Sequence, residues 1–132
     1  MDPHKLEELP LFKPLGKRER ERIASVADEV DVREGKELLH QGDFAHEFMV
    51  VLDGQAEVLR DSEHVADLSP GDFLGEAAAL DRSQRNATVV ARSSMTVLVM
   101  TDRDLRHIAR DMPDVDQQLR AAAREHCPLT SS

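Results

Sequence analysis

Short runs of strand-forming residues alternate with turn-forming residues from residue 30 to residue 101. This pattern restricts the possible folds more than any other feature of the chain. Gly42, Gly54 and the Pro70-Gly71 pair stand between runs, where the backbone can turn. About seven or eight short strands at this spacing predict a sandwich, a jelly roll or a barrel. The predicted strands are residues 30–32, 37–40, 48–52, 56–59, 65–68, 87–90 and 95–100.

Helical patterns flank the strands on both sides. Residues 4–29 place apolar residues at helical spacing, and prolines and a glycine divide them into a short and a longer helix. Residues 102–126 are predicted to form two C-terminal helices. Thr101 is the predicted N-cap of the first, and Pro113 begins the second. The tail, residues 127–132, is expected to fray.

The size and composition of the chain fit one domain, residues 1–132, with a single core. No apolar run approaches the ~20 residues that a membrane-spanning helix needs, and the N-terminus lacks the features of a secretory signal. We therefore expect a cytoplasmic protein. The formal net charge of −9 opposes long-range attraction to nucleic acid or to a membrane surface, so neither is an expected partner. The lone Cys127 cannot form an internal disulfide.

The stretch from Gly71 to Leu80 interrupts the β texture with one predicted helical turn that starts after Gly75. A helix start next to a glycine presents unpaired N–H groups at close range, which favours an anion and above all a phosphate. Arg85 could return to this helix start across a loop and bind two phosphate oxygens, whereas Glu76 would hold a sugar hydroxyl. A carboxylate beside an anion site indicates a ligand with hydroxyls next to its charge, as in a nucleotide.

Leu74-Gly75-Glu76 followed by Arg85-Asn86-Ala87-Thr88 resembles the phosphate-binding cassette of the cyclic nucleotide-binding domain family. The spacing between the Glu and the Arg is the family's usual one, and the likeness extends over residues 6–126. The resemblance implies a mainly β fold with flanking helices. We expect a jelly-roll-like β-roll of about eight strands over residues 30–101, with N-terminal helices over 4–29 and two C-terminal helices.

The resemblance also implies a function and a role for each cassette residue. The chain would bind a cyclic nucleotide, with cyclic AMP slightly favoured over cyclic GMP, and act as a regulatory sensor rather than an enzyme, without cofactor or metal. Glu76 would accept a hydrogen bond from the ribose 2′-hydroxyl, and Arg85 would pair with the cyclic phosphate. The other predicted ligand-binding residues are Val65 and Leu74 beneath the base, Gly75 and Asn86 in the motif, and Ala77, Ala78 and Ala87, whose amides would complete the oxyanion cradle.

Three departures from the family pattern bear on coupling and base preference. Ala77 and Ala79 are smaller than the residues often found there, which usually transmit binding to the C-terminal helices. Asn86 can donate or accept, so it does not decide between cyclic AMP and cyclic GMP. The last helix has no aromatic residue to cap a base. The candidates for capping the base are instead Leu119, Ala122, Ala123, Arg124 and His126.

Two protein partners stay open: an effector protein, and a second copy of the chain in a homodimer formed through the last helix.

Other interpretations use the same residues. Glu76 and Arg85 could pair with each other in a ligand-free module that docks a protein, although an exposed ion pair contributes only ~0–1 kcal/mol. A DNA-binding regulator of this family would need a separate helix-turn-helix domain, which these residues do not encode. His40, His46 and Glu47 are residue types that can bind a metal ion. An open metal site early in a β fold would need two histidines close together on one strand, and the spacing of His40 and His46 does not provide them.

Overall fold

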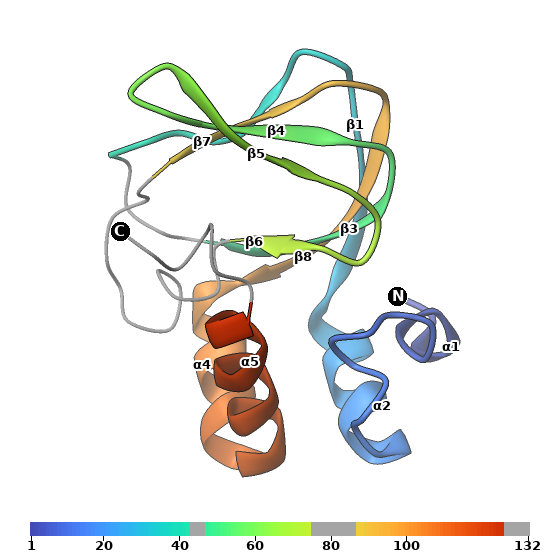
Figure 1. The fold of residues 1–132 in the computed structure, drawn as a ribbon. Helices are drawn as coiled ribbons and strands as arrows, with labels where there is room; N and C mark the ends of the chain where they lie inside the picture. The colour runs from blue at the N-terminus through green and yellow to red at the C-terminus, as the bar shows by residue number, and fades with distance from the viewer. Residues whose placement is uncertain (43–46, 75–86, 126–132) are drawn as a thin grey trace.

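The computed structural model of the chain describes residues 1–42, 47–74 and 87–125. Two antiparallel sheets of four strands each face one another, and helices lie beneath one of them (Figure 1). The helices are α1 (Pro3–Leu6), α2 (Lys17–Val26), α4 (Asp102–Asp111) and α5 (Pro113–Glu125). The strands are β1 (Asp28–Val32), β2 (Glu37–Leu39), β3 (Glu47–Asp53), β4 (Ala56–Arg60), β5 (Glu63–Leu68), β6 (Phe73–Leu74), β7 (Thr88–Ala91) and β8 (Met95–Thr101).

The strand order is β1-β8-β3-β6 in the first sheet and β2-β7-β4-β5 in the second. Neighbours in both sheets pair antiparallel. The chain crosses between the sheets repeatedly, because β2 and β7 belong to one sheet while β1, β3 and β8 belong to the other. The eight strands in the described residues, with helices on both sides in sequence, confirm the predicted β-roll.

Apart from shifts of one or two residues at strand ends, the strand region differs from the sequence prediction in two places. The helical region predicted to reach residue 29 ends at Val26, because residues 28–32 pair with β8 as strand β1. The two-residue strand β6 was not predicted. It is too short to show an alternating pattern, and it exists because Phe73 and Leu74 pair with Val50 and Met49 of β3.

The buried apolar side chains form two clusters, one on each face of the first sheet. Alternate residues of β3 point to opposite sides, so Phe48 and Val50 face the helices while Met49 and Val51 face the inside of the roll. The helix-side cluster contains Leu6, Leu9, Leu11, Phe12, Leu15, Ile23, Ala24, Ala27, Phe48, Val50, Phe73, Leu98, Met100, Leu105, Ile108 and Val115. The interior cluster contains Val32, Met49, Val51, Ala56, Val58, Leu68, Leu74, Ala87, Val89, Ala91, Met95 and Val97.

The C-terminal helices are fixed to the first sheet at their start. The Thr101 hydroxyl accepts a hydrogen bond from the amide of Asp104 at 3.1 Å, which confirms the predicted N-cap. Leu105 and Ile108 of α4 and Val115 of α5 are almost fully buried in the helix-side cluster. Both helices are therefore part of the same packed unit as β3 and β8.

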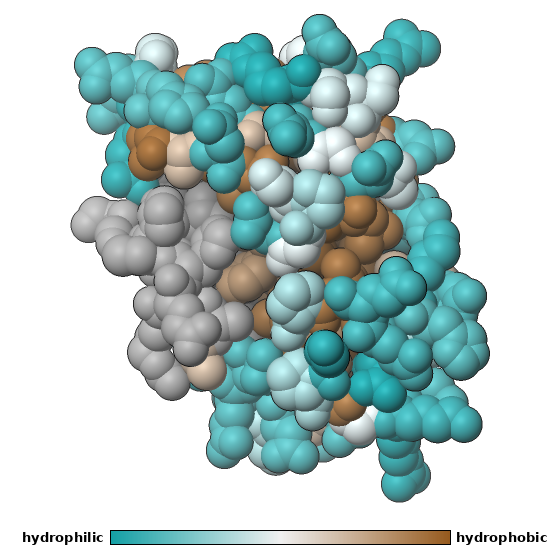
Figure 2. Space-filling model, turned by 45° about the vertical axis from the view of Figure 1, so that its right-hand side comes forward, coloured by the Kyte–Doolittle hydropathy of each residue, from teal (hydrophilic) through white to brown (hydrophobic). Residues whose placement is uncertain are grey.

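The outer surface is mainly hydrophilic on the face drawn in Figure 2, where apolar side chains show between polar ones. Large apolar side chains that are exposed in the described residues are Val30 at 40% and Val65 at 39%. In the described part of the chain, no helix combines the length and the apolar character needed to cross a membrane.

Candidate ligand-binding site

The predicted cassette is flanked by the end of β6 and the start of β7. Leu74, the last residue of β6, pairs with Met49 at the edge of the first sheet. Thr88, the first residue of β7, pairs with Leu59 in the second sheet. Leu74 and Thr88 therefore belong to different sheets of the roll.

Three of the predicted ligand-binding residues lie in the described part of the chain. Leu74 and Ala87 are buried and both belong to the interior cluster, so the two ends of the cassette rest on one apolar layer. Val65 belongs to β5 and is 39% exposed, at a register shift that leaves it between the Val58↔Ala66 and Leu59↔His64 pairs. The contacts of these residues with a base stay predictions.

The remaining predicted residues fall outside the described residues. Their assigned roles, including the ribose contact of Glu76 and the phosphate contact of Arg85, therefore stay predictions. Four of the five candidates for capping the base have their backbone in α5, and His126 lies outside the described range. The predicted residues without a described position are Gly75, Glu76, Ala77, Ala78, Arg85 and Asn86.

Gln41 links the start of β7 to two turns of the roll, a contact that the sequence did not indicate. Its backbone amide donates to the Thr88 hydroxyl at 3.0 Å. Its side-chain amide donates to an Asp61 carboxylate oxygen at 3.0 Å and accepts from the Asp61 amide at 2.9 Å. Thr88 is separated from Gln41 by 47 residues, so no local pattern could have predicted the contact.

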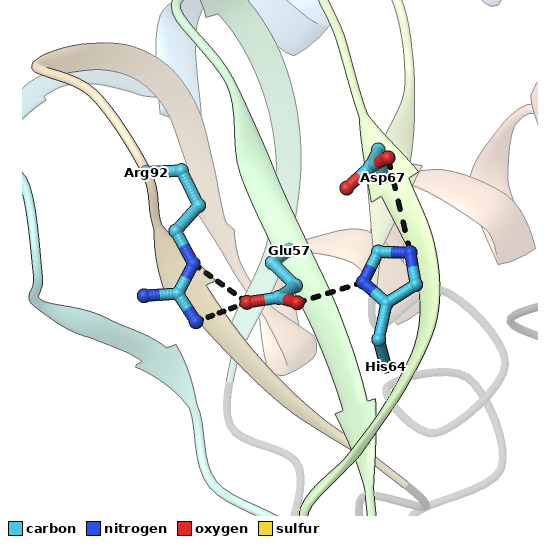
Figure 3. Close-up of polar contacts among 4 residues, drawn as sticks. All are labelled: Glu57, His64, Asp67 and Arg92. Atoms are coloured by element: carbon cyan, nitrogen blue, oxygen red, sulfur yellow. Dashed lines mark hydrogen bonds and ion pairs between the residues drawn. The ribbon is translucent and has the colours of Figure 1, made fainter.

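A second polar cluster lies on the outer face of the second sheet (Figure 3). Glu57 of β4 accepts a 2.6 Å hydrogen bond from Nε of Arg92 and lies 2.7 Å from Nδ1 of His64 on β5. The Arg92 hydrogen bond, followed by the His64 contact, lowers the pKa of the Glu57 carboxyl from its usual value. The other ring nitrogen of His64 lies 3.8 Å from Asp67. This cluster ties β4, β5 and the residue after β7 together.

The described residues do not provide a set of ligands for the metal site that His40, His46 and Glu47 suggested. Nδ1 of His40 lies 3.3 Å from a carboxylate oxygen of Glu37, an ion-pair distance between the first residue of β2 and the residue that follows the strand. Within residues 1–42, 47–74 and 87–125, no group of three or more His, Cys, Asp and Glu side chains could hold a metal ion. His46 lies outside those ranges.

A cleft of about 730 Å³ lies between α2 and the junction of α4 and α5. Arg18 and Arg22 of α2 line one side, and Asp111 and Asp114 line the other. Arg22 and Asp111 approach each other to 3.4 Å across it. Neither Leu74 nor Thr88 belongs to its lining, so this cleft is separate from the ends of the cassette.

A comparison with models of protein families identifies the family of this chain. A family model described as "Cyclic nucleotide-binding domain" matches residues 29–111, which is more than half of the chain. The chain belongs to the cyclic nucleotide-binding domain family. The match begins in β1 and ends in α4, so it includes the eight strands of the described residues, except Asp28, and the cassette segment.

Relatives of this cyclic nucleotide-binding domain include regulatory subunits of cAMP-dependent protein kinase. The subunit from Schizosaccharomyces pombe is 36% identical over 91 residues, covering 68% of this chain and 22% of that protein. The one from Blastocladiella emersonii is 29% identical over 118 residues, covering 86% of this chain and 29% of that protein. The chain thus spans less than a third of the length of these relatives.

Solved structures of bacterial regulators have the same fold as this cyclic nucleotide-binding domain. The catabolite activator protein of Thermus thermophilus superposes with a TM-score of 0.79 at 27% identity, covering 89% of this chain and 57% of that one. The N-terminal domain of a transcriptional regulator from Streptomyces coelicolor superposes with a TM-score of 0.76 at 28% identity, covering 92% and 91%.

Proposed function

We propose that this domain binds a cyclic nucleotide between β6 and β7 and acts as a regulatory sensor. The observation that carries the proposal is the Gly75-Glu76 and Arg85-Asn86-Ala87 motif, set within a family match that spans residues 29–111. The described ends of the motif, Leu74 and Ala87, support it because both are anchored in the interior cluster. Such anchoring keeps the ends of a binding segment fixed when the ligand is absent.

The chemistry of the motif assigns the phosphate to Arg85 and the ribose to Glu76. A guanidinium can bind two phosphate oxygens at once, and an ionised carboxylate can only accept, as a sugar hydroxyl requires. At an effective dielectric constant of ~20, opposite charges ~4 Å apart attract by about 4 kcal/mol before desolvation. Micromolar affinity corresponds to about −8 kcal/mol in total, so this one pair would supply a large part of the binding free energy.

We favour cyclic AMP over cyclic GMP as the ligand. The names of the relatives from Schizosaccharomyces pombe and Blastocladiella emersonii refer to cAMP-dependent protein kinase, which supports the choice. Asn86 is neutral in this respect, because its amide can serve either base. A direct comparison of the two nucleotides decides the preference.

A route from the ligand to the C-terminal helices supports the sensor role. The two residues of β6 belong to different clusters: Leu74 belongs to the interior cluster, whereas Phe73 belongs to the helix-side cluster. The Phe73 ring lies 6.3 Å from that of Phe48, centroid to centroid, in the cluster that also holds Leu105 and Val115 of the C-terminal helices. A shift of β6 on ligand binding would therefore change the packing of α4 and α5, which an effector protein could detect.

Thermal unfolding with and without nucleotide tests the proposal. The purified domain is heated in the presence of cyclic AMP, cyclic GMP or non-cyclic AMP, each at millimolar concentration. A ligand at 100 times its dissociation constant stabilises the folded state by about 2.7 kcal/mol. A domain of about 130 residues should then melt several degrees higher. We expect the largest rise with cyclic AMP, a smaller one with cyclic GMP and none with AMP.

Two results would contradict the proposal. No rise with either cyclic nucleotide would instead favour a protein-docking module whose cassette no longer binds ligand. An equal rise with non-cyclic AMP would show that the site recognises a nucleotide without requiring the cyclic phosphate.

A further inference from the structure

Gln41 joins three loops at one end of the roll through hydrogen bonds made by its backbone and its side chain. These loops are the turn after β2, the turn between β4 and β5, and the start of β7, which lie together at the left of Figure 1. We call Gln41, Asp61 and Thr88 the three-loop clamp. Its members come from parts of the sequence that are 20 and 47 residues away from Gln41.

The β4–β5 turn consists of Asp61 and Ser62 alone, and the Gln41 side chain binds the first of them. Asp61 has a φ of 53° and Ser62 a φ of 68°, the positive values that a two-residue hairpin turn needs at both positions. Asp61 is the residue that the Gln41 side chain holds on both its amide and its carboxylate. Gln41 therefore connects this hairpin turn to the start of β7.

The clamp also fixes Thr88, the last residue of the cassette motif. Thr88 follows Arg85 by three residues, and three residues of extended chain span at most about 10 Å. The position of Thr88 therefore restricts where the Arg85 backbone can lie. A displaced Thr88 would change the approach of the guanidinium to a phosphate.

We propose that Gln41 and Thr88 are positioning residues that fix the start of β7, and thereby limit where Arg85, three residues earlier in the chain, can meet a cyclic phosphate. The proposal rests on the proposed function. A positioning role for the clamp differs from a purely structural role in one measurable way. Its hydrogen bonds are solvent-exposed or partly buried, so breaking one should change folding stability little while changing ligand affinity more.

The chain offers a matched control for the Thr88 contact. At the other end of β7, the Ser93 hydroxyl accepts a hydrogen bond from the Gln55 backbone amide at 3.0 Å, the same distance as in the Gln41–Thr88 contact. Ser93 lies in the turn before β8 and not beside the cassette. Ser93→Ala thus removes a comparable accepted bond, together with the one that its hydroxyl donates to the Ser94 carbonyl oxygen, without touching Thr88.

The experiment compares four variants of the full chain by calorimetric titration with cyclic AMP and by thermal unfolding without ligand. Thr88→Val keeps the shape of the side chain but cannot accept the hydrogen bond, and we expect it to weaken affinity about tenfold. Gln41→Ala removes the two side-chain bonds to Asp61 but keeps the backbone amide that donates to Thr88, so it should weaken affinity less than Thr88→Val does. Thr88→Ser, which keeps the hydroxyl, should restore most of the affinity, and Ser93→Ala should leave it unchanged. The melting temperatures of Thr88→Val and Ser93→Ala should fall by similar amounts.

The double variant Gln41→Ala with Thr88→Val separates positioning from a direct ligand contact of Thr88. Loss of affinity less than the product of the two single losses supports the clamp, because both residues then act on one element. Independent, multiplicative losses would overturn it. Equal affinity of wild type and Thr88→Val would overturn the clamp and leave the proposed function intact. A wild type that binds no cyclic nucleotide would overturn both.

Discussion

The guanidinium of Arg92 donates two hydrogen bonds, from Nε and from a terminal nitrogen, to one carboxylate oxygen of Glu57. The other oxygen of Glu57 lies 2.7 Å from Nδ1 of His64. Glu57 thus joins two partners that are 35 and 7 residues away in sequence. Because Ala56 and Val58 on either side of it point into the interior cluster, Glu57 faces outward and ties three segments of the second sheet from outside.

The Glu57 cluster should make folding stability depend on pH in the acid range. The pKa of Glu57 in the folded protein is below its ordinary value of 4.5, first because of the Arg92 hydrogen bond and then because of His64. A carboxyl of this kind contributes stability that is fully present above its unfolded pKa and is lost as pH falls through its folded pKa. We expect Glu57→Gln to lose stability at neutral pH and to show a weaker acid dependence than wild type.

Urea denaturation at several pH values between about 2 and 7 measures this dependence. Glu34→Gln, at an exposed turn residue, serves as the control and should retain the acid dependence of wild type. If Glu57→Gln and wild type lose stability in parallel as pH falls, the cluster does not contribute to acid sensitivity.

Gly54 should tolerate alanine much less well than Gly35, although both have a φ of +90°. A Cβ at Gly54 would lie 2.5 Å from the Ser94 carbonyl oxygen and 2.9 Å from the Met95 Cα, whereas a Cβ at Gly35 would meet nothing within 4 Å. Gly35→Ala should cost about 1–2 kcal/mol for the left-handed conformation alone. Gly54→Ala should cost about 1–3 kcal/mol more, because the backbone must move. Denaturation midpoints of both variants test this, and equal losses would contradict it.

Leu105 should be a main contributor to the attachment of α4. Its side chain is 1% exposed and belongs to the helix-side cluster, so Leu105→Ala should destabilise the protein by about 2–5 kcal/mol. Val30→Ala is the control, because Val30 is 40% exposed on β1 and should change stability by less than about 0.5 kcal/mol. Chemical denaturation followed by circular dichroism compares them, and a loss below about 1 kcal/mol for Leu105→Ala would show that α4 packs loosely.

The sequence predicted those parts of the fold that depend on local patterns. The run from Met95 to Met100 is a short, almost wholly apolar stretch with two valines, as in a buried strand, and Thr101 precedes a helical pattern as an N-cap should, so both were predicted. Strand β6 was missed because it exists only through pairing with β3, and the start of β1 was read as helix because its residues Asp28 and Glu29 show no strand pattern. Partners distant in sequence decide such elements.

The candidate site shows the same difference between local patterns, which the sequence reveals, and contacts between distant residues, which it does not. The cassette motif was found because its residues lie close together in sequence, and its flanking residues Leu74 and Ala87 are buried in one cluster. The contacts of Gln41 with Thr88 and Asp61 were not found, because side-chain hydrogen bonds between distant turns leave no periodic signal. The sequence therefore predicts the residues that would contact a ligand, but not the residues that would hold them in position.

Arg85 should be the residue whose loss most weakens cyclic nucleotide binding. Arg85→Ala removes a charge-assisted pair worth ~3 kcal/mol, so calorimetry should show affinity for cyclic AMP reduced about 100-fold or more. Arg85→Lys should recover only part of it, because an ammonium cannot bind two phosphate oxygens in one plane. Arg92→Ala is the control with the same charge change, since Arg92 binds Glu57 on the outer face of the second sheet. If Arg85→Ala and Arg92→Ala reduced affinity equally, the effect would come from net charge and not from contact with the phosphate.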